Sequence, residues 1–410
     1  MFTWLALCSL IVSSIKPLYF GSYFWYSTSY TLFIRSLILY CGKIRAGMLI
    51  GFIGFLGAHF FIFMLTLCLV FMAIAFFCSN FLFFLVFFEL RIIPIALLML
   101  KFSKGDEKNE AIVGMIYFNL LGSIPFILIA FKNFDYNLHC FFQELYFYNS
   151  LLLFFRFSLI FLAKIPIIFF HLWLPKAHGR ASGTCSMILA RLVLKLGTFG
   201  MLKFSSRIVK DSSLLNVVFF TIGVFSSLLF SLFILRFFDL KYTVACSSVL
   251  HIRMITPIVL LSQGFSVFSA ICMIVGHGLV SFFLFYLVTL MYERTQTRSS
   301  SMNKSEEINC KIFSAIVFLA LFFNLGLPPI INFIREIGFC SISRKFSIGA
   351  VLILFLCLVL TIFFTFIISS SMLYGKKVLK SKNKALFIEI ANFKEVTILI
   401  LLLPLIIYLF

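Results

Sequence analysis

Six ionisable residues lie within long apolar stretches of the 410-residue sequence. They are Glu89, Lys164, Lys195, His251, His277 and Glu336. At the centre of a bilayer a charged side chain costs about 2.5 to 3.5 kcal/mol on insertion scales, so such residues are rare there and commonly mark ion pathways, proton relays or buried ion pairs. We treat these six residues as the candidate functional set.

Five of the six also have a structural explanation that the sequence leaves open. Lys164 and Lys195 could extend their amines to the membrane surface, although both lie more than one turn inside apolar runs. Glu89 could form a purely structural ion pair with a lysine. The two histidines, His251 and His277, could be hydrogen-bonded packing residues instead of proton carriers.

Prolines interrupt the helical pattern beside two of these charges. Prolines 166 and 175 lie near Lys164 in "FLAKIPIIFFHLWLPKAH", and a double proline in "NLGLPPIINFIRE" lies before Glu336. Proline frees backbone polar groups, which are tolerated at membrane depth mainly where they line a cavity or a buried site. The pattern predicts two structural repeats, each with a broken helix that meets a polar pathway near the middle of the membrane.

The composition identifies the surroundings of these residues. Hydrophobic residues make up 62% of the chain and charged residues 12%, with a mean hydropathy of +1.13, whereas soluble domains contain about 25% charged residues. Apolar runs of roughly 20 residues, long enough to cross a bilayer, recur from end to end. The sequence therefore predicts an all-α, polytopic transmembrane bundle of about 12 to 14 helices.

The boundaries of several helices can be predicted from the same runs. We expect single helices over 79–101 and 242–261, and a proline-interrupted helix over 311–337. Segment 50–78 is too long for one upright helix and short for two, so roughly three or four helices are expected before residue 80. The opening run 1–15 lacks a basic segment and a cleavage signal, so we expect it to be retained as a helix.

Several classes of site are excluded by the pattern. The eleven cysteines are scattered singly with no C-x-x-C pair, which argues against iron–sulfur clusters, zinc and disulfide frameworks. No G-x-G-x-x-G nucleotide motif is visible. The net charge of +20 is dispersed over short loops, so it reflects membrane topology better than nucleic-acid binding, and the side richer in lysine and arginine should face the cytoplasm or matrix.

Several stretches in the middle of the chain resemble one known family. "KIPIIFFHLWLPKAH" followed by "SMILARLVLKLGTFGML" resembles the core signature of NADH-ubiquinone oxidoreductase chain 4, the antiporter-like proton-pumping subunit of mitochondrial complex I. "FFELRIIP", "FDLKYTVACSSVLHI", "GHGLVSFFLFYL", "YERTQTR" and "NLGLPPIINFIREI" follow in the family's order. The resemblance extends from Phe87 to Ile337.

The resemblance implies a role for each member of the candidate set. Glu89 matches the family's membrane glutamate, and Lys164 matches the lysine of the first broken helix, with which it would form a proton-sensitive ion pair. Lys195 matches the central relay lysine. The histidines at 251 and 277 match those of the central polar axis, and Glu336 matches the acidic group of the second broken helix.

The resemblance also implies an architecture and partners. Transmembrane helices at 1–78 and 342–410 would flank an antiporter-like core at 79–341 with two inverted repeats. The chain would be a multi-pass protein of the mitochondrial inner membrane that contacts other membrane subunits of complex I and lipid, without nucleic acid. It would bind no cofactor, while NADH, FMN, iron–sulfur clusters and ubiquinone would reside in partner subunits.

Two other functions remain open at this point. One is a free-standing cation/proton antiporter of the same architecture, which co-purification with NADH-oxidising subunits would distinguish. The other is an inert membrane scaffold whose charges form only structural pairs. A scaffold predicts that neutralising Lys195 leaves proton transport unchanged.

The sequence departs from the family in two respects. After "LPKAH" the family usually has Val-Glu-Ala-Pro, whereas this chain has "GRAS" at 179–182. Arginines at 91, 191, 253 and 335 occupy helix positions where the family usually has small or neutral residues. Because some mitochondrial genetic codes read AGA and AGG as serine or glycine, standard-code translation could have created them. Alternatively they reach lipid phosphates or partners, and Arg335 could pair with Glu336.

Overall fold

The computed structural model describes most of the central part of the chain. The described residues are 52–78, 80–103, 107–133, 161–166, 170–208, 213–234, 236–237, 239–255, 264–295, 297–300, 311–326, 331–346 and 348–373. Over these residues the chain is helical, with an isolated β-bridge between Asp239 and Ser299 and no β-strand in the described part. The predicted all-α fold is confirmed.

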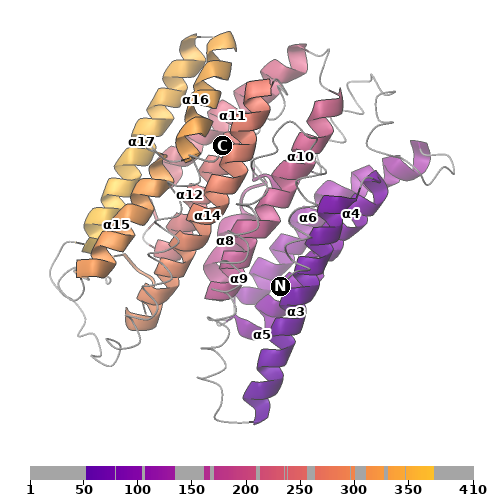
Figure 1. Ribbon diagram of the computed structural model, residues 1–410, viewed down its shortest axis with the longest axis vertical. Helices are drawn as coiled ribbons and strands as arrows, with labels where there is room; N and C mark the ends of the chain where they lie inside the picture. Colours follow the sequence, from indigo (N-terminus) through magenta and orange to yellow (C-terminus); the bar gives the residue numbers. More distant parts are fainter. Residues whose placement is uncertain are drawn as a thin grey trace.

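Four helices form one side of the bundle (Figure 1). They are α3 (Phe52–Phe77), α4 (Phe81–Leu90), α5 (Ile92–Phe102) and α6 (Lys108–Asn133). The segment expected to be ambiguous, 50–78, is a single helix over its described part. At about 1.5 Å per residue its 26 residues exceed a hydrocarbon core of about 30 Å, a mismatch that tilting accommodates.

The expected span over 79–101 is present as an apolar helical stretch over Phe83–Phe102, with one interruption at Arg91 between α4 and α5. Pro94 explains the break, since a proline ring clashes with the carbonyl four residues earlier, here that of Leu90. Arg91 therefore lies at a turn within the membrane segment, and Glu89 lies one residue before the end of α4.

The middle of the bundle contains short and irregular helices. They are α8 (Trp173–Arg180), α9 (Gly183–Ile188), the π-helical turn η2 (Leu189–Val193), α10 (Leu194–Ile208) and α12 (Leu240–Arg253). The hydroxyl of Ser182 caps α9, and the carboxylate of Asp239 caps α12. This cap starts α12 two residues earlier than expected, while the expected end at 261 lies outside the described residues.

The remaining helices complete the bundle on the other side. They are α11 (Ser213–Ile234), α14 (Gly264–Thr295), α15 (Lys311–Leu325), α16 (Ile331–Phe346) and α17 (Ile348–Leu373). In Figure 1, α15, α16 and α17 lie at the opposite side from α3, with α12 and α14 between the two groups. The predicted break after "NLGL" is present, since α15 ends at Leu325 and Gly326 adopts a φ of 76°. Glycine at this position terminates helices readily, and the prolines that follow cannot continue one.

The helices differ in how much of their surface is buried. Over the described residues, five helices are long and apolar enough to cross a membrane. α17 exposes large apolar side chains such as Phe355 and Phe363, whereas every residue of α12 except Tyr242 is buried. The bundle therefore encloses α12, which carries His251, and presents apolar surface at α17.

Candidate functional site

Glu89 and Lys164 form an ion pair between two separate helical segments. Lys164 Nζ donates a hydrogen bond to Oε1 of Glu89, and the lysine side chain is 3% exposed against 20% for the glutamate. The amine also lies 3.7 Å from the centroid of the Phe88 ring. The pair that the sequence led us to expect is therefore present, in an environment where each charge depends on the other.

Arg91 connects this pair to the neighbouring helix. Its guanidinium donates 2.8 Å hydrogen bonds to the carbonyl oxygens of Phe88 and Val193. Its central carbon lies 4.4 Å from the centroid of the Phe88 ring. Val193 ends the π-helical turn two residues before Lys195. A contiguous set of contacts thus joins the backbone beside Glu89 to the backbone beside Lys195.

Lys195 lies at the centre of the buried polar groups. Its Nζ is 3.1 Å from Nδ1 of His277 and 3.5 Å from Oγ of Ser281, and it also donates to the carbonyl of Ala190. The side chain is 7% exposed. π-helical turns within α-helices are frequent at functional sites, and this one ends two residues before Lys195.

The two predicted histidines lie next to each other, and one of them contacts Lys195. The ring centroids of His251 on α12 and His277 on α14 are 5.6 Å apart, and both side chains are buried. Lys195, His277 and His251 therefore form a sequence of neighbours through the bundle interior. Three residues that lie far apart in the sequence are brought together here by three different helices.

Glu336 occupies a separate position at the break between α15 and α16. A Cβ atom at Gly326 would lie only 2.8 Å from Oε1 of Glu336, so the carboxylate packs directly against the glycine backbone. Asn332, one turn earlier on α16, donates a 3.2 Å hydrogen bond from Nδ2 to the carbonyl of Phe323 on α15. The side-chain amide thus binds the two halves of the broken helix to each other.

Two buried polar residues were missed by the sequence reasoning. His178 is fully buried and stacks on Phe285 with ring centroids 4.6 Å apart, and neither ring nitrogen has a hydrogen-bond partner among the described residues. Lys241, which lies just before the expected helix 242–261, is buried and donates to the carbonyl of Ala181. The capping signal of Asp239 could have placed Lys241 in the first helical turn.

The "GRAS" segment at 179–182 is held by contacts of its own. Arg298 donates a 2.8 Å hydrogen bond to the carbonyl of Gly179, and Arg180 forms an ion pair with Glu107. Lys241 donates a hydrogen bond to the carbonyl of Ala181, and the Ser182 hydroxyl caps α9. The segment thus differs from the family pattern in its residues. It is nevertheless hydrogen-bonded to Lys241 of α12 and to Arg298.

Buried arginines are accommodated by carbonyl oxygens and aromatic rings. Arg253 donates to the carbonyls of Pro166 and Ser226, at 2.5 and 3.0 Å, and lies 4.1 Å from the ring centroid of Phe230. Arg191 is buried with its guanidinium 5.6 Å from the ring centroid of Phe282. The side chain of Arg335 lies outside the described residues. Whether these positions are arginine in the mature protein stays a prediction.

Comparisons with known proteins agree with this geometry. The family model of NADH:quinone oxidoreductase/Mrp antiporter transmembrane subunits matches residues 78–365. NADH-ubiquinone oxidoreductase chain 4 of Rhipicephalus sanguineus is 35% identical over 301 residues, which cover 72% of this chain and 69% of the relative. The chain 4 protein of Petromyzon marinus is 33% identical over 318 residues, covering 74% of this chain and 68% of the relative.

Solved structures share the fold. A chain of respiratory complex I from Thermus thermophilus with bound NADH superimposes with a TM-score of 0.78 at 19% identity, covering 94% of this chain and 80% of that one. A chain of the Mrp complex from Dietzia gives a TM-score of 0.69 at 18% identity, covering 76% of this chain and 60% of that one. The antiporter-like bundle with broken helices is thus confirmed.

Proposed function

Because the chain belongs to the NADH-ubiquinone oxidoreductase chain 4 family of antiporter-like membrane subunits, we propose that it translocates protons as a core membrane subunit of respiratory complex I. Electron transfer from NADH to ubiquinone in other subunits drives the transport. The chain is a multi-pass protein of the mitochondrial inner membrane. NADH, FMN, iron–sulfur clusters and ubiquinone are bound by its partners.

The contact between Lys195 and His277 carries this proposal. An amine and an imidazole at hydrogen-bond distance exchange a proton without movement of the backbone, and both groups are buried away from competing water. His251 extends the path by one ring. The three residues supply successive proton acceptors near the centre of the membrane, which a purely structural pair does not require.

The Glu89–Lys164 pair is the control element of the proposed mechanism. When the carboxylate lies against the Lys164 amine, it favours the charged form of that amine, and separation of the pair removes this stabilisation. Movement of the Glu89 carboxylate thereby changes the proton affinity of the Lys164 amine.

Proton transport by the intact complex tests the proposal. Lys195→Ala in an assembled complex should abolish NADH-driven proton transport while the other subunits remain bound. Normal transport by that complex would favour the scaffold function instead. Purification of the chain without NADH-oxidising subunits, together with cation/proton exchange by the isolated protein, would favour the free-standing antiporter.

A further inference from the structure

The aromatic ring of Phe88 lies directly beside the Glu89–Lys164 pair. Its centroid is 3.7 Å from Lys164 Nζ, well within the roughly 6 Å over which an ammonium and an aromatic face attract each other. Both the ring and the lysine side chain are buried. The attraction between a cation and a ring is strongest where water is excluded. Lys164 therefore has two sources of charge stabilisation, a carboxylate and the face of a ring.

The carboxylate is the less firmly held of these two partners. Glu89 lies one residue before the end of α4, and its side chain is 20% exposed. Its Oε2 atom has no hydrogen-bond partner among the described residues, so within this part of the chain the carboxylate is bound through one oxygen only. Few contacts have to break when the carboxylate moves away from the amine.

The ring of Phe88, in contrast, is held by two neighbouring rings. Phe84, one turn earlier on α4, stacks on it with ring centroids 5.3 Å apart, and Phe161 meets it edge to face at 6.1 Å. All three rings are fully buried. Gly200 of α10 packs so closely on this cluster that a Cβ atom there would collide with the rings of Phe161 and Phe84. The position of the Phe88 ring is therefore fixed by packing.

Phe161 also relates the ring to the amine. It lies three residues before Lys164 in the same helical segment, 161–166, where the amide of Ile165 donates a 2.7 Å hydrogen bond to the Phe161 carbonyl. Residues three apart in a helix lie on the same side of it. One segment thus presents both the ring that holds Phe88 in place and the amine that lies over the face of Phe88.

We propose that Phe88 is a positioning residue that holds the Lys164 ammonium when the Glu89 carboxylate is neutralised or moves away. An ammonium left in the bundle interior without a carboxylate needs another source of electron density, and the fixed ring face supplies it. The amine then keeps a defined position between two states of the ion pair. Phe88 takes this role within the proton transport proposed above, on which this inference rests.

A double-mutant cycle on the purified complex tests the contact between the ring and the ammonium. Phe88→Leu replaces the ring with an apolar chain, and Lys164→Met replaces the amine with an apolar chain of similar length. Because the ring acts through the ammonium, Phe88→Leu should lower the melting temperature more when Lys164 is present than when it is replaced by methionine. Arg91, whose guanidinium carbon lies 4.4 Å from the same ring centroid, is present in all four proteins and does not contribute to the difference.

The amount of assembled complex gives the same comparison for any variant that is too unstable to purify. Phe88→Leu should reduce assembly more strongly in the presence of Lys164 than together with Lys164→Met. Equal losses in both backgrounds, by melting temperature or by assembly, would show that the ring only packs, and this result would overturn the proposal.

NADH-driven proton transport by the intact complex tests whether the contact matters for function. Phe88→Leu should slow transport by about fivefold to thirtyfold, the rate equivalent of one desolvated contact between a cation and a ring. Phe88→Tyr keeps the ring face and should recover most of the rate. Phe220→Leu removes another buried ring, on α11, which packs against Phe339 of α16, and should leave the rate unchanged.

The outcomes separate this inference from the proposed function. Coupling between Phe88 and Lys164 together with slowed transport supports the proposal. If Lys195→Ala stops transport while Phe88→Leu transports as fast as Phe220→Leu, the role of Phe88 is wrong and the relay stands. If Lys195→Ala transports normally, the proposed proton transport is wrong and the role of Phe88 is wrong with it.

Discussion

Lys195 Nζ lies 3.1 Å from Nδ1 of His277, although the two residues are 82 positions apart in the chain. The contact joins α10 to α14 directly after a π-helical turn. It brings a primary amine and an imidazole together where both are buried. Two bases in contact cannot both hold an extra proton without repulsion, so a proton arriving at one favours release from the other.

Substitution of Lys195 should therefore stop proton transport with little effect on assembly. Lys195→Ala removes the proton acceptor, and Lys195→Arg keeps a charge that does not dissociate in this range. We expect both variants to lose NADH-driven proton transport in membrane vesicles. Lys176→Ala, at an exposed lysine, is the matched control and should transport normally. Full activity of Lys195→Arg would rule out a titrating role for this residue.

Much of this site could be predicted from the sequence because its elements are local patterns. Charges within apolar runs identified the candidate set, and the glycine and double proline after Asn324 identified the second break. The Glu89–Lys164 contact came from the family resemblance, and the structure contains it. These features depend on residue type and position, which a single sequence displays directly.

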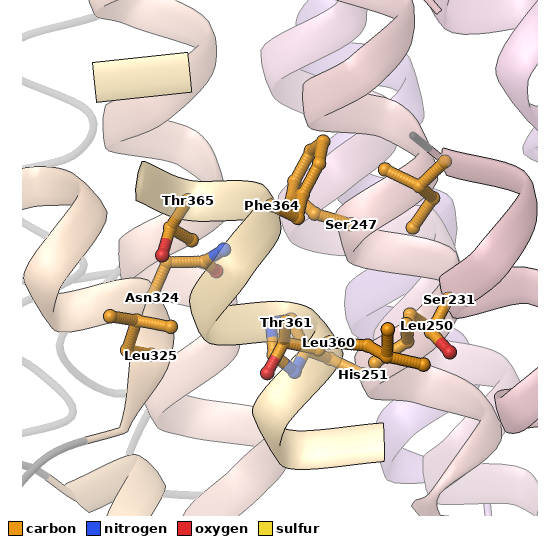
Figure 2. Close-up of a pocket in the computed structure, with 11 residues that line it drawn as sticks. Ser231, Ser247, Leu250, His251, Asn324, Leu325, Leu360, Thr361, Phe364 and Thr365 are labelled. Carbon is orange, nitrogen blue, oxygen red and sulfur yellow. The ribbon is translucent and has the colours of Figure 1, made fainter. Parts of the chain in front are cut away.

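Other features depend on packing between distant segments and were not predictable in this way. Pro94 splits the expected helix at Arg91, but the consequence for Glu89 depends on which helix lies opposite. The burial of Lys241 results from its contact with Ala181, 60 residues away. A small cavity between α11, α12, α15 and α17 is formed by residues of all four helices and has no signature in any one of them (Figure 2).

Removal of both charges at the Glu89–Lys164 pair should be less harmful than removal of either one. Glu89→Gln or Lys164→Met leaves a single uncompensated charge in the interior, which costs about 3 to 5 kcal/mol. The double variant leaves none. We expect the amount of assembled complex to fall in each single variant and to recover partly in the double variant.

An exposed pair provides the control for this cycle. Lys176 and Glu110 are 2.6 Å apart, with 53% and 66% of their side chains exposed. The hydrogen bond and charge of Lys176 lower the pKa of the Glu110 carboxyl below its ordinary value. Water screens exposed pairs, so the same cycle there should show little coupling. Strictly additive effects at Glu89 and Lys164 would remove the pair from the mechanism.

A methyl group at Gly200 should disturb the helix that carries Lys164. A Cβ atom there would lie 2.4 Å from a ring carbon of Phe161 and 3.0 Å from the ring of Phe84, both fully buried. Neither ring has space to move, so Gly200→Ala should destabilise the fold by about 1 to 3 kcal/mol. Thermal unfolding of the purified complex measures this effect.

Gly114 offers a matched glycine in open space. No atom lies within 4 Å of a Cβ built at this position in α6. Gly114→Ala should leave stability unchanged or raise it by up to about 1 kcal/mol, because alanine favours helix more than glycine does. Equal melting temperatures for the two variants would show that the close approach at Gly200 has no energetic consequence.

The buried arginines should prove to be small residues in the mature protein. Arg91, Arg191 and Arg253 are all buried, and the Nη2 atom of Arg91 has no hydrogen-bond partner among the described residues. Each charge at this depth costs about 2.5 kcal/mol or more on insertion scales. Serine or glycine at these sites, as some mitochondrial codes give for AGA and AGG, would remove that cost and suit close helix packing.

Peptide mass spectrometry of the protein isolated from its natural membrane decides this prediction. Peptides across "FFELRIIP" and "ILARLVLK" contain positions 91 and 191. We expect serine or glycine masses there and at positions 253 and 335, with a true net charge below the formal +20. The unchanged lysine at 195 in the second peptide serves as an internal control. Arginine masses at positions 91 and 191 would end the hypothesis, and the carbonyl contacts of Arg91 would then be native features of the site.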